Sequence, residues 1–215
     1  MLAEIEGGGI PIDFTSLRQL IDEAAPPGSL SEGSYQAACV FLLLFEKQEP
    51  YILAIQKSDN DGYPWRNQIA FPGGHIDKHD ASPMAAAFRE LREELDISRN
   101  QVEFMGSLGH FQTVTKPRDI EVFVGWWNGK GPVRCDTVEI SRVLEIPLRK
   151  LIQTHEANGY HGRHPGVKDL TYPFQDVTIW GASARILHHF IELIYPWLER
   201  QGYIARKSIK EEAVF

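Results

Sequence analysis

Three glutamates, Glu90, Glu93 and Glu94, stand close together in a segment rich in helix-forming residues. Spacings of three and four residues place side chains on the same face of a helix. Carboxylates held that close repel one another, and a bound divalent cation would remove this cost. Hard cations such as Mg²⁺ prefer oxygen ligands and often share them with substrate phosphates. The glutamates therefore predict a site for Mg²⁺ or Mn²⁺, against the alternative of a solvated, salt-bridged helix face.

The residues before the glutamates favour the metal site. Gly73 and Gly74 form a loop, which allows the backbone to turn tightly. Ser82 followed by Pro83 is typical of a helix start, with serine as the N-cap and proline in the first turn. We therefore predict a helix over residues 83–95 that follows a glycine loop.

This loop and helix resemble the Nudix box, which reads Gly, five residues, Glu, seven residues, Arg-Glu-hydrophobic-x-Glu-Glu-x-Gly-hydrophobic. Gly74 matches the first glycine, and Arg89 begins the Arg-Glu run. Asp80 replaces the first Glu, eight residues separate it from Arg89, and Asp96 replaces the last glycine. Aspartate tolerates the left-handed conformation that glycine usually takes at a helix end. The resemblance implies that Arg89 pairs with Asp80 and orients the loop.

The same resemblance implies a metal-dependent hydrolase that cleaves the diphosphate linkage of a nucleoside diphosphate derivative. Glu90, Glu93 and Glu94 would hold the metal, and a carboxylate would take a proton from the attacking water. Glu90 and Glu139 are rival candidates for that base. Glu139 stands where one branch of the family carries a glutamate after the core strands, although a surface charge at the start of a strand is the alternative.

That branch is the coenzyme A pyrophosphatase-like Nudix hydrolases, which the chain resembles over residues 67–80, 139–148 and 178–187. The stretch at 57–68 lacks the branch's Leu-Arg-x-His element. Coenzyme A is the first substrate that the resemblance implies, and ADP-ribose, NADH, dinucleoside polyphosphates and nucleoside triphosphates are alternatives. A different alternative is a Nudix-fold sensor that binds a nucleotide metabolite without cleaving it.

Four residues upstream of the box are candidates for contact with substrate. Tyr63 and Trp65 would stack on a base or another ring, or else pack a turn. Arg66 is predicted to contact substrate phosphates, since guanidinium groups commonly do so. Lys57 is interpreted as an ordinary exposed charge.

Length and charge limit the classes of protein. The chain has 215 residues, which suits one globular domain, and a net charge of −7, which argues against nonspecific binding of nucleic acid. Two cysteines do not indicate a disulfide framework. The first nine residues do not resemble a signal peptide, and no apolar run is long enough for a membrane span. We expect a cytoplasmic protein, and the family resemblance favours a homodimer.

Apolar runs and turn residues predict an α+β protein, which the resemblance sharpens to a Nudix fold, an α/β/α sandwich with a mixed central sheet. Residues 1–33 are predicted as an extension with a short helix, 34–200 as the Nudix domain and 201–215 as a tail. Helices are expected over residues 14–25, 83–95, 148–154 and 181–200. Strands are expected over residues 37–45, 51–56, 68–71, 101–112, 120–127 and 141–146, with a polar loop over 155–170. The segment 172–180 is expected to end in a strand.

Five histidines need their own interpretation. His155, His161 and His164 could indicate a metal site, but their spacing matches no zinc pattern well and no cysteine stands nearby. We interpret them as members of a flexible polar loop. His188 and His189 lie on the last predicted helix and are expected to face solvent or pack.

Overall fold

The computed structural model describes residues 14–24, 34–61, 65–113, 117–135 and 137–204. Its helices are α1 Phe14–Asp22, α2 Pro83–Leu95, α3 Leu148–Ala157 and α4 Gly181–Arg200, with a 3₁₀ turn at Arg99–Gln101. Its strands are β1 Gln36–Glu46, β2 Pro50–Lys57, β3 Ile69–Ala70, β4 Gly73–His75, β5 Val102–Gln112, β6 Arg118–Trp127, β7 Ile140–Pro147, β8 Tyr172–Phe174 and β9 Val177–Ile179.

Seven strands form one mixed sheet with the order β3-β2-β1-β6-β5, to which β4 adds beside β1 and β7 beside β2. Strands β1 and β6 are parallel, and the other pairs are antiparallel. Strands β8 and β9 form a separate hairpin. The predicted mixed sheet is therefore confirmed.

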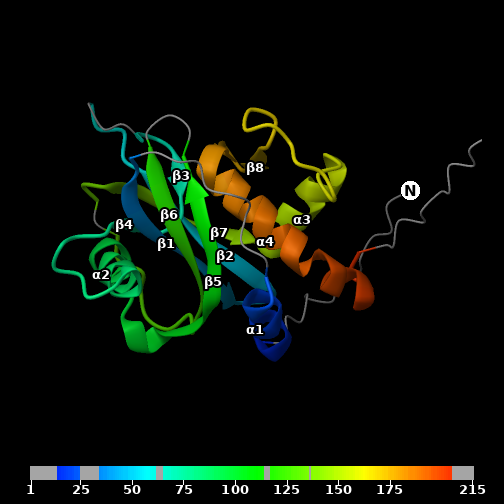
Figure 1. The fold of residues 1–215 in the computed structure, drawn as a ribbon, viewed down its shortest axis with the longest axis horizontal. Coiled ribbons are helices and arrows are strands. Elements are labelled where there is room, and N and C mark those ends of the chain that lie inside the picture. Colours follow the sequence, from blue (N-terminus) through cyan, green and yellow to red (C-terminus); the bar gives the residue numbers. More distant parts are fainter. Residues whose placement is uncertain (1–13, 25–33, 62–64, 114–116, 136, 205–215) are drawn as a thin grey trace, which may run out of the picture.

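Strand β1 explains why the sheet carries helices on both faces. Its side chains alternate between the faces, so an almost wholly apolar strand supplies two cores. Leu42 and Leu44 belong to the core shared with α4, whereas Phe41 and Leu43 belong to the core shared with α2. Figure 1 shows α2 on one side of the sheet and α4 on the other. This is the predicted α/β/α sandwich.

Helix α1 packs against β5 and buries Leu17 and Ile21 in the α4-side core. The helix ends at Asp22, earlier than the predicted end at residue 25, which lies outside the described residues. The division of the chain at residues 33 and 200 stays a prediction. In the described part of the chain no helix is long and apolar enough to cross a membrane.

Three segments differ from the sequence-based expectations. Helix α3 continues to Ala157, so His155 lies in a helix and is completely buried rather than in a polar loop. The segment 172–180, which was predicted only to end in a strand, is a tight hairpin of two short strands. Strand β4 was not predicted because Gly-Gly-His has no strand preference of its own and is held by its pairing with β1.

Candidate active site

Helix α2 begins and ends as its sequence predicts. Ser82 is extended and its hydroxyl accepts a hydrogen bond from the Ala85 amide at 3.1 Å, and Pro83 follows in the first turn. Asp96 adopts the left-handed conformation with φ 57°, and its amide bonds back to the Arg92 carbonyl at 3.1 Å. The aspartate in place of the glycine therefore still ends the helix at the usual position.

The two glycines each allow a close contact. Gly73 lies against the backbone of β1, and Gly74 lies against the carboxylate of Glu90. Gly73 has φ +145°, and a Cβ there would lie 2.2 Å from the Cys39 carbonyl oxygen of β1. A Cβ on Gly74 would lie 2.5 Å from the carboxyl carbon of Glu90. Only glycine fits at Gly73, and at Gly74 a side chain would displace Glu90.

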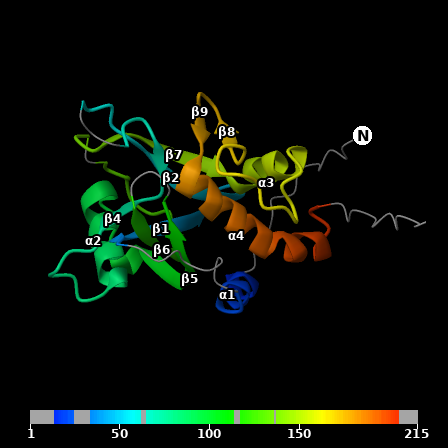
Figure 2. The same ribbon diagram turned by 45° about the horizontal axis from the view of Figure 1, so that its top comes forward.

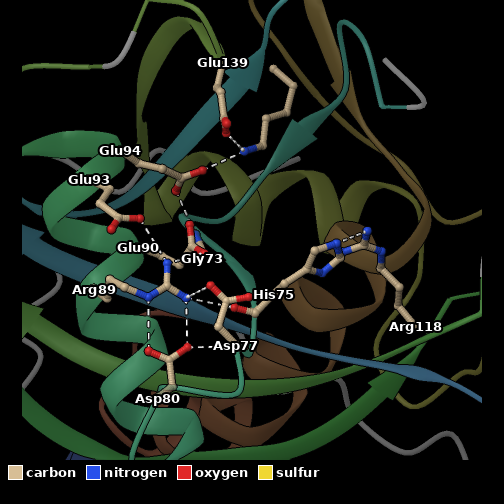
Figure 3. Close-up of polar contacts among 11 residues, drawn as sticks. Gly73, His75, Asp77, Asp80, Arg89, Glu90, Glu93, Glu94, Arg118 and Glu139 are labelled. Atoms are coloured by element: carbon tan, nitrogen blue, oxygen red, sulfur yellow. Dashed lines mark hydrogen bonds and ion pairs between the residues drawn. The ribbon is translucent and has the colours of Figure 1, made fainter. Parts of the chain in front are cut away.

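Arg89 joins the loop to the helix (Figure 3). Its Nε and Nη2 donate to the two carboxylate oxygens of Asp80 at 3.1 and 2.9 Å, and Nη2 also donates to the His75 carbonyl at 3.0 Å. Its Nη1 donates to Glu90 at 2.9 Å and to Glu93 at 3.0 Å. The pair predicted between Arg89 and Asp80 is present, and the same guanidinium holds two of the helix carboxylates.

Glu94 is buried, and each of its two carboxylate oxygens accepts a hydrogen bond. One carboxylate oxygen accepts a hydrogen bond from Lys57 Nζ at 2.6 Å, and the other accepts from the Gly73 amide at 2.8 Å. Lys57 Nζ also lies 4.0 Å from Glu139. The interpretation of Lys57 as an exposed charge was wrong, because its side chain is only 10% exposed and neutralises a buried carboxylate.

The helix carboxylates differ in their surroundings. Burial raises the pKa of Glu90 although the Arg89 hydrogen bond opposes this, and the nearby Glu93 charge raises it further. Burial also raises the pKa of Glu94, against the effect of Lys57. The side chain of Glu93 is 59% exposed. Burial and like charge thus disfavour the ionised forms of Glu90 and Glu94, a cost that a bound cation would relieve.

The site opens into a cavity of about 520 Å³. The residues on its acidic side are Glu90, Glu93 and Glu139, beside Gly73 and Gly74. The aromatic and basic residues that line it include Trp65, His75, Arg118, Trp180 and Arg185. The cavity therefore combines carboxylates with guanidinium groups and flat rings.

Trp65, His75 and Arg118 form one cluster in this cavity. The Arg118 guanidinium lies over the Trp65 ring, 4.1 Å from its centroid, and its two terminal nitrogens lie 2.7 and 2.8 Å from the His75 ring nitrogens. Figure 3 shows the His75 ring facing Arg118, with Arg89 on the opposite side of His75, next to α2. A guanidinium stacked on an aromatic ring is pre-oriented to bind an anion.

The structure places the residues that were predicted to contact substrate differently with respect to the cavity. Trp65 lines the cavity, whereas Tyr63 lies outside the described residues. Arg66 does not line the cavity, and its guanidinium pairs with Asp61 at 3.1 Å. Sequence reasoning missed Arg118, because the parallel pairing of β1 with β6, not a motif, brings it beside β4.

The donor atoms suit a hard divalent cation. Glu90 and Glu93 reach the cavity from α2 and Glu139 from the turn before β7, whereas the buried Glu94 does not line the cavity. Both oxygens of Glu94 already accept hydrogen bonds, one from Lys57 and one from the Gly73 amide, and its role as a metal ligand stays a prediction. Oxygen-only donors match Mg²⁺ or Mn²⁺ better than a soft metal.

Comparison with known proteins decides the family. The protein-family model described as the NUDIX domain matches residues 35–170, which is more than half of the 215 residues. The chain belongs to the Nudix family. It is a Nudix hydrolase, of a class of pyrophosphohydrolases that act on nucleoside diphosphate derivatives and generally use divalent metal ions.

The Nudix relatives cover most of the chain. A protein of Escherichia coli strain K12, named uncharacterized Nudix hydrolase NudL, is 30% identical over 178 residues, covering 81% of this chain and 90% of the relative. A protein of the same name from Photorhabdus laumondii is 28% identical over 187 residues, covering 85% and 96%. A solved MutT/nudix family structure from Enterococcus faecalis has a TM-score of 0.51 at 17% identity, covering 80% of this chain and 67% of that one. The last likeness shows the Nudix fold.

Proposed function

We propose that this Nudix hydrolase cleaves the diphosphate linkage of coenzyme A or of a closely related nucleoside diphosphate metabolite. The observation that carries the proposal is a single cavity with carboxylates of α2 on one side and the Arg118–Trp65 stack on the other. A substrate that joins a flat base to a diphosphate needs both kinds of surface. The sequence similarity to the coenzyme A branch supports coenzyme A as the first candidate.

Binding would use the rings and guanidinium groups. Trp65 lines the cavity, and so does Trp180, a residue that is 48% exposed. Both offer faces on which an adenine ring can stack. Arg118 offers a charged donor for phosphate oxygens, and Arg185 is held in the same cavity by a 2.7 Å hydrogen bond to the Gln112 carbonyl. These contacts position the diphosphate beside the helix carboxylates.

Catalysis would use Glu90, Glu93 and Glu94 as the residues that hold Mg²⁺ or Mn²⁺. The bound ion would neutralise charge on the phosphates and lower the pKa of the attacking water. Arg89 keeps Glu90 and Glu93 in place through hydrogen bonds of 2.9 and 3.0 Å. Pre-organised carboxylates suit phosphoryl transfer, which depends mainly on positioning and electrostatic stabilisation.

The base that takes the proton from water is Glu90 or Glu139. Glu90 is partly buried on α2 and lines the cavity beside Glu93. Glu139 is more exposed and reaches the cavity from the β7 side. Glu139→Gln tests the choice, because Glu139 is not one of the proposed metal ligands. If kcat/KM of this variant no longer falls at acidic pH, Glu139 is the base, whereas an unchanged pH profile favours Glu90.

A substrate panel tests the proposal. The full-length protein is assayed with Mg²⁺ or Mn²⁺ on coenzyme A, ADP-ribose, NADH, diadenosine polyphosphates and nucleoside triphosphates, and products are identified by mass. We expect cleavage of coenzyme A to a 4′-phosphopantetheine product and an adenosine bisphosphate, lost in chelator and restored by either metal. Cleavage of another compound alone would overturn the coenzyme A assignment. Binding of the panel without any turnover would instead favour the sensor.

A further inference from the structure

A second group of metal-ligating side chains lies on the face of the sheet opposite α2. His155 belongs to α3, and His188 and Glu192 belong to α4, the two helices that lie side by side in Figures 1 and 2. Each of the three residues offers one ligand atom, and these atoms lie within 4.8 Å of one another. None of the three lines the cavity of the Nudix box.

Glu192 is the centre of this cluster. One of its carboxylate oxygens lies 2.7 Å from His155 Nε2 and 3.0 Å from His161 Nδ1. The other oxygen accepts a hydrogen bond from the Gly162 amide at 3.0 Å. The carboxylate therefore faces two imidazole nitrogens and one backbone amide.

The two helix histidines are oriented through their other ring nitrogens. His155 is completely buried, and its Nδ1 lies 2.9 Å from the Tyr172 hydroxyl. His188 is 9% exposed and makes a hydrogen bond with the Tyr160 backbone. Since its Nε2 is buried without a hydrogen-bond partner in the described part of the chain, the bond to Tyr160 involves Nδ1. Metal-bound histidines characteristically use the second nitrogen in this way.

The unsatisfied nitrogen needs an explanation, because a buried polar atom without a partner costs free energy. A neutral imidazole whose Nδ1 is a donor carries a lone pair on Nε2. The His155 and His188 rings are 5.1 Å apart between centroids and tilted by 45°, so they do not stack. A cation placed among the three side chains would give the lone pair of His188 a partner.

We propose that His155, His188 and Glu192 form a binding site for a Zn²⁺ ion, separate from the hydrolytic site. Two imidazoles and one carboxylate suit Zn²⁺, whereas Mg²⁺ prefers oxygen-only surroundings. Three protein ligands leave one position of a tetrahedron for water or for His161, whose ring stacks on Tyr195 at 3.6 Å. The ion would join α3 to α4 and to the loop at 160–162.

Zinc binding is measured on the full-length protein after removal of metals, by competition with a chromophoric chelator in excess Mg²⁺. We expect one Zn²⁺ per chain and, at Zn²⁺ about 100 times the Kd, a rise in Tm of about 5 °C or more. Co²⁺ in place of Zn²⁺ should give the intense visible absorption of a four-coordinate ion.

His188→Gln should weaken binding by about 100-fold or more, and so should Glu192→Gln. The matched control is His189→Gln, the same change one position along α4, where the ring packs edge-on against Phe111 instead. Glu93→Gln provides a control for the Nudix box. Circular dichroism of each variant establishes that it is folded before binding is measured.

The proposal is overturned if the folded protein binds no Zn²⁺ in excess Mg²⁺. It is also overturned if binding persists in both His188→Gln and Glu192→Gln, or if Glu93→Gln alone removes it. In those cases His155 and Glu192 form only a hydrogen-bonded pair that packs α3 against α4. None of these readouts depends on hydrolysis, so the result is independent of the proposed function.

Discussion

The buried pair of Lys57 and Glu94 stabilises the fold as well as the site. Their side chains are 10% and 4% exposed, and the ion pair is 2.6 Å long. Lys57→Met leaves Glu94 as a buried charge without its cation, which should lower the free energy of unfolding by about 3 kcal/mol or more. Urea unfolding measures the change, with Lys150→Met on the exposed side of α3 as the control.

A second variant shows whether the charge itself is responsible. Lys57→Met combined with Glu94→Gln removes both charges and keeps an acceptor for the Gly73 amide. We expect the double variant to recover most of the lost stability. If it were no more stable than Lys57→Met, packing of the lysine stem rather than charge compensation would explain the effect.

Asp80 links loop stability to pH through Arg89. Hydrogen bonds from Arg89 hold the pKa of Asp80 below its ordinary value of 3.8. A carboxylate with a lowered folded-state pKa contributes stability that is full above the unfolded-state pKa and is lost as the pH falls through the folded-state value. Asp80→Asn should therefore lower Tm at pH 7, and its difference from the wild type should shrink below about pH 4.

Thermal unfolding between pH 7 and pH 3 gives this comparison. Asp77→Asn is the control, because Asp77 is exposed and lies 3.7 Å from Arg89 without a close hydrogen bond. A constant difference between Asp80→Asn and the wild type over the whole range would contradict the linkage.

Single residues show where sequence reasoning succeeds and where it stops. The Arg89–Asp80 pair follows from the motif, because both residues lie in one continuous segment. The burial of Lys57 could not be predicted from the sequence, since it depends on α2, which is distant along the chain, covering the end of β2. Arg118 reaches the cavity through strand pairing, and the nearby His75 and Trp65 that hold it are far from it in sequence.

At the scale of elements, the turn from β4 into the box depends on two glycines in different ways. Gly73→Ala would place a Cβ 2.2 Å from a backbone oxygen at φ +145°, so it should destabilise the protein by about 3 kcal/mol or more. Gly74→Ala would meet only the flexible end of the Glu90 side chain, so stability should change little while kcat falls about 100-fold.

Gly129→Ala is the matched control, because Gly129 has φ +66° and a Cβ added there would meet no atom of the described residues within 4 Å. This substitution should lower the free energy of unfolding by about 1 kcal/mol, which is the effect of placing a non-glycine residue in a left-handed conformation. Urea unfolding and steady-state kinetics separate the three variants. Equal loss of stability in Gly73→Ala and Gly129→Ala would contradict the close contact between β4 and β1.

Elements with strong local signals were predicted well. Helix α2 has a cap, a proline and a run of helix formers, and its observed bounds are those expected, 83–95. Helix α3 was predicted too short, because its last turn carries His155 in a polar-looking sequence and is stabilised by burial against Tyr172 and Glu192. Tertiary packing decided that turn, not local preference.

For the whole molecule, the two faces of the sheet carry different chemistry. The face with α2 presents carboxylates to a substrate cavity, and the opposite face buries α4 with the cluster of His155, His188 and Glu192. The Nudix resemblance implied the α/β/α sandwich, but the sequence alone could not bring α3 and α4 together. A cytoplasmic location and a homodimer stay predictions.

The central claim is that the carboxylates of α2 perform metal-dependent hydrolysis. The most direct measurement is kcat of Glu93→Gln on the substrate that the wild type cleaves, with Mg²⁺ and with Glu103→Gln, an exposed position on β5, as the control. We predict a loss of about 100-fold or more for Glu93→Gln at unchanged Tm, and wild-type turnover for Glu103→Gln. Normal turnover by a folded Glu93→Gln would contradict the account.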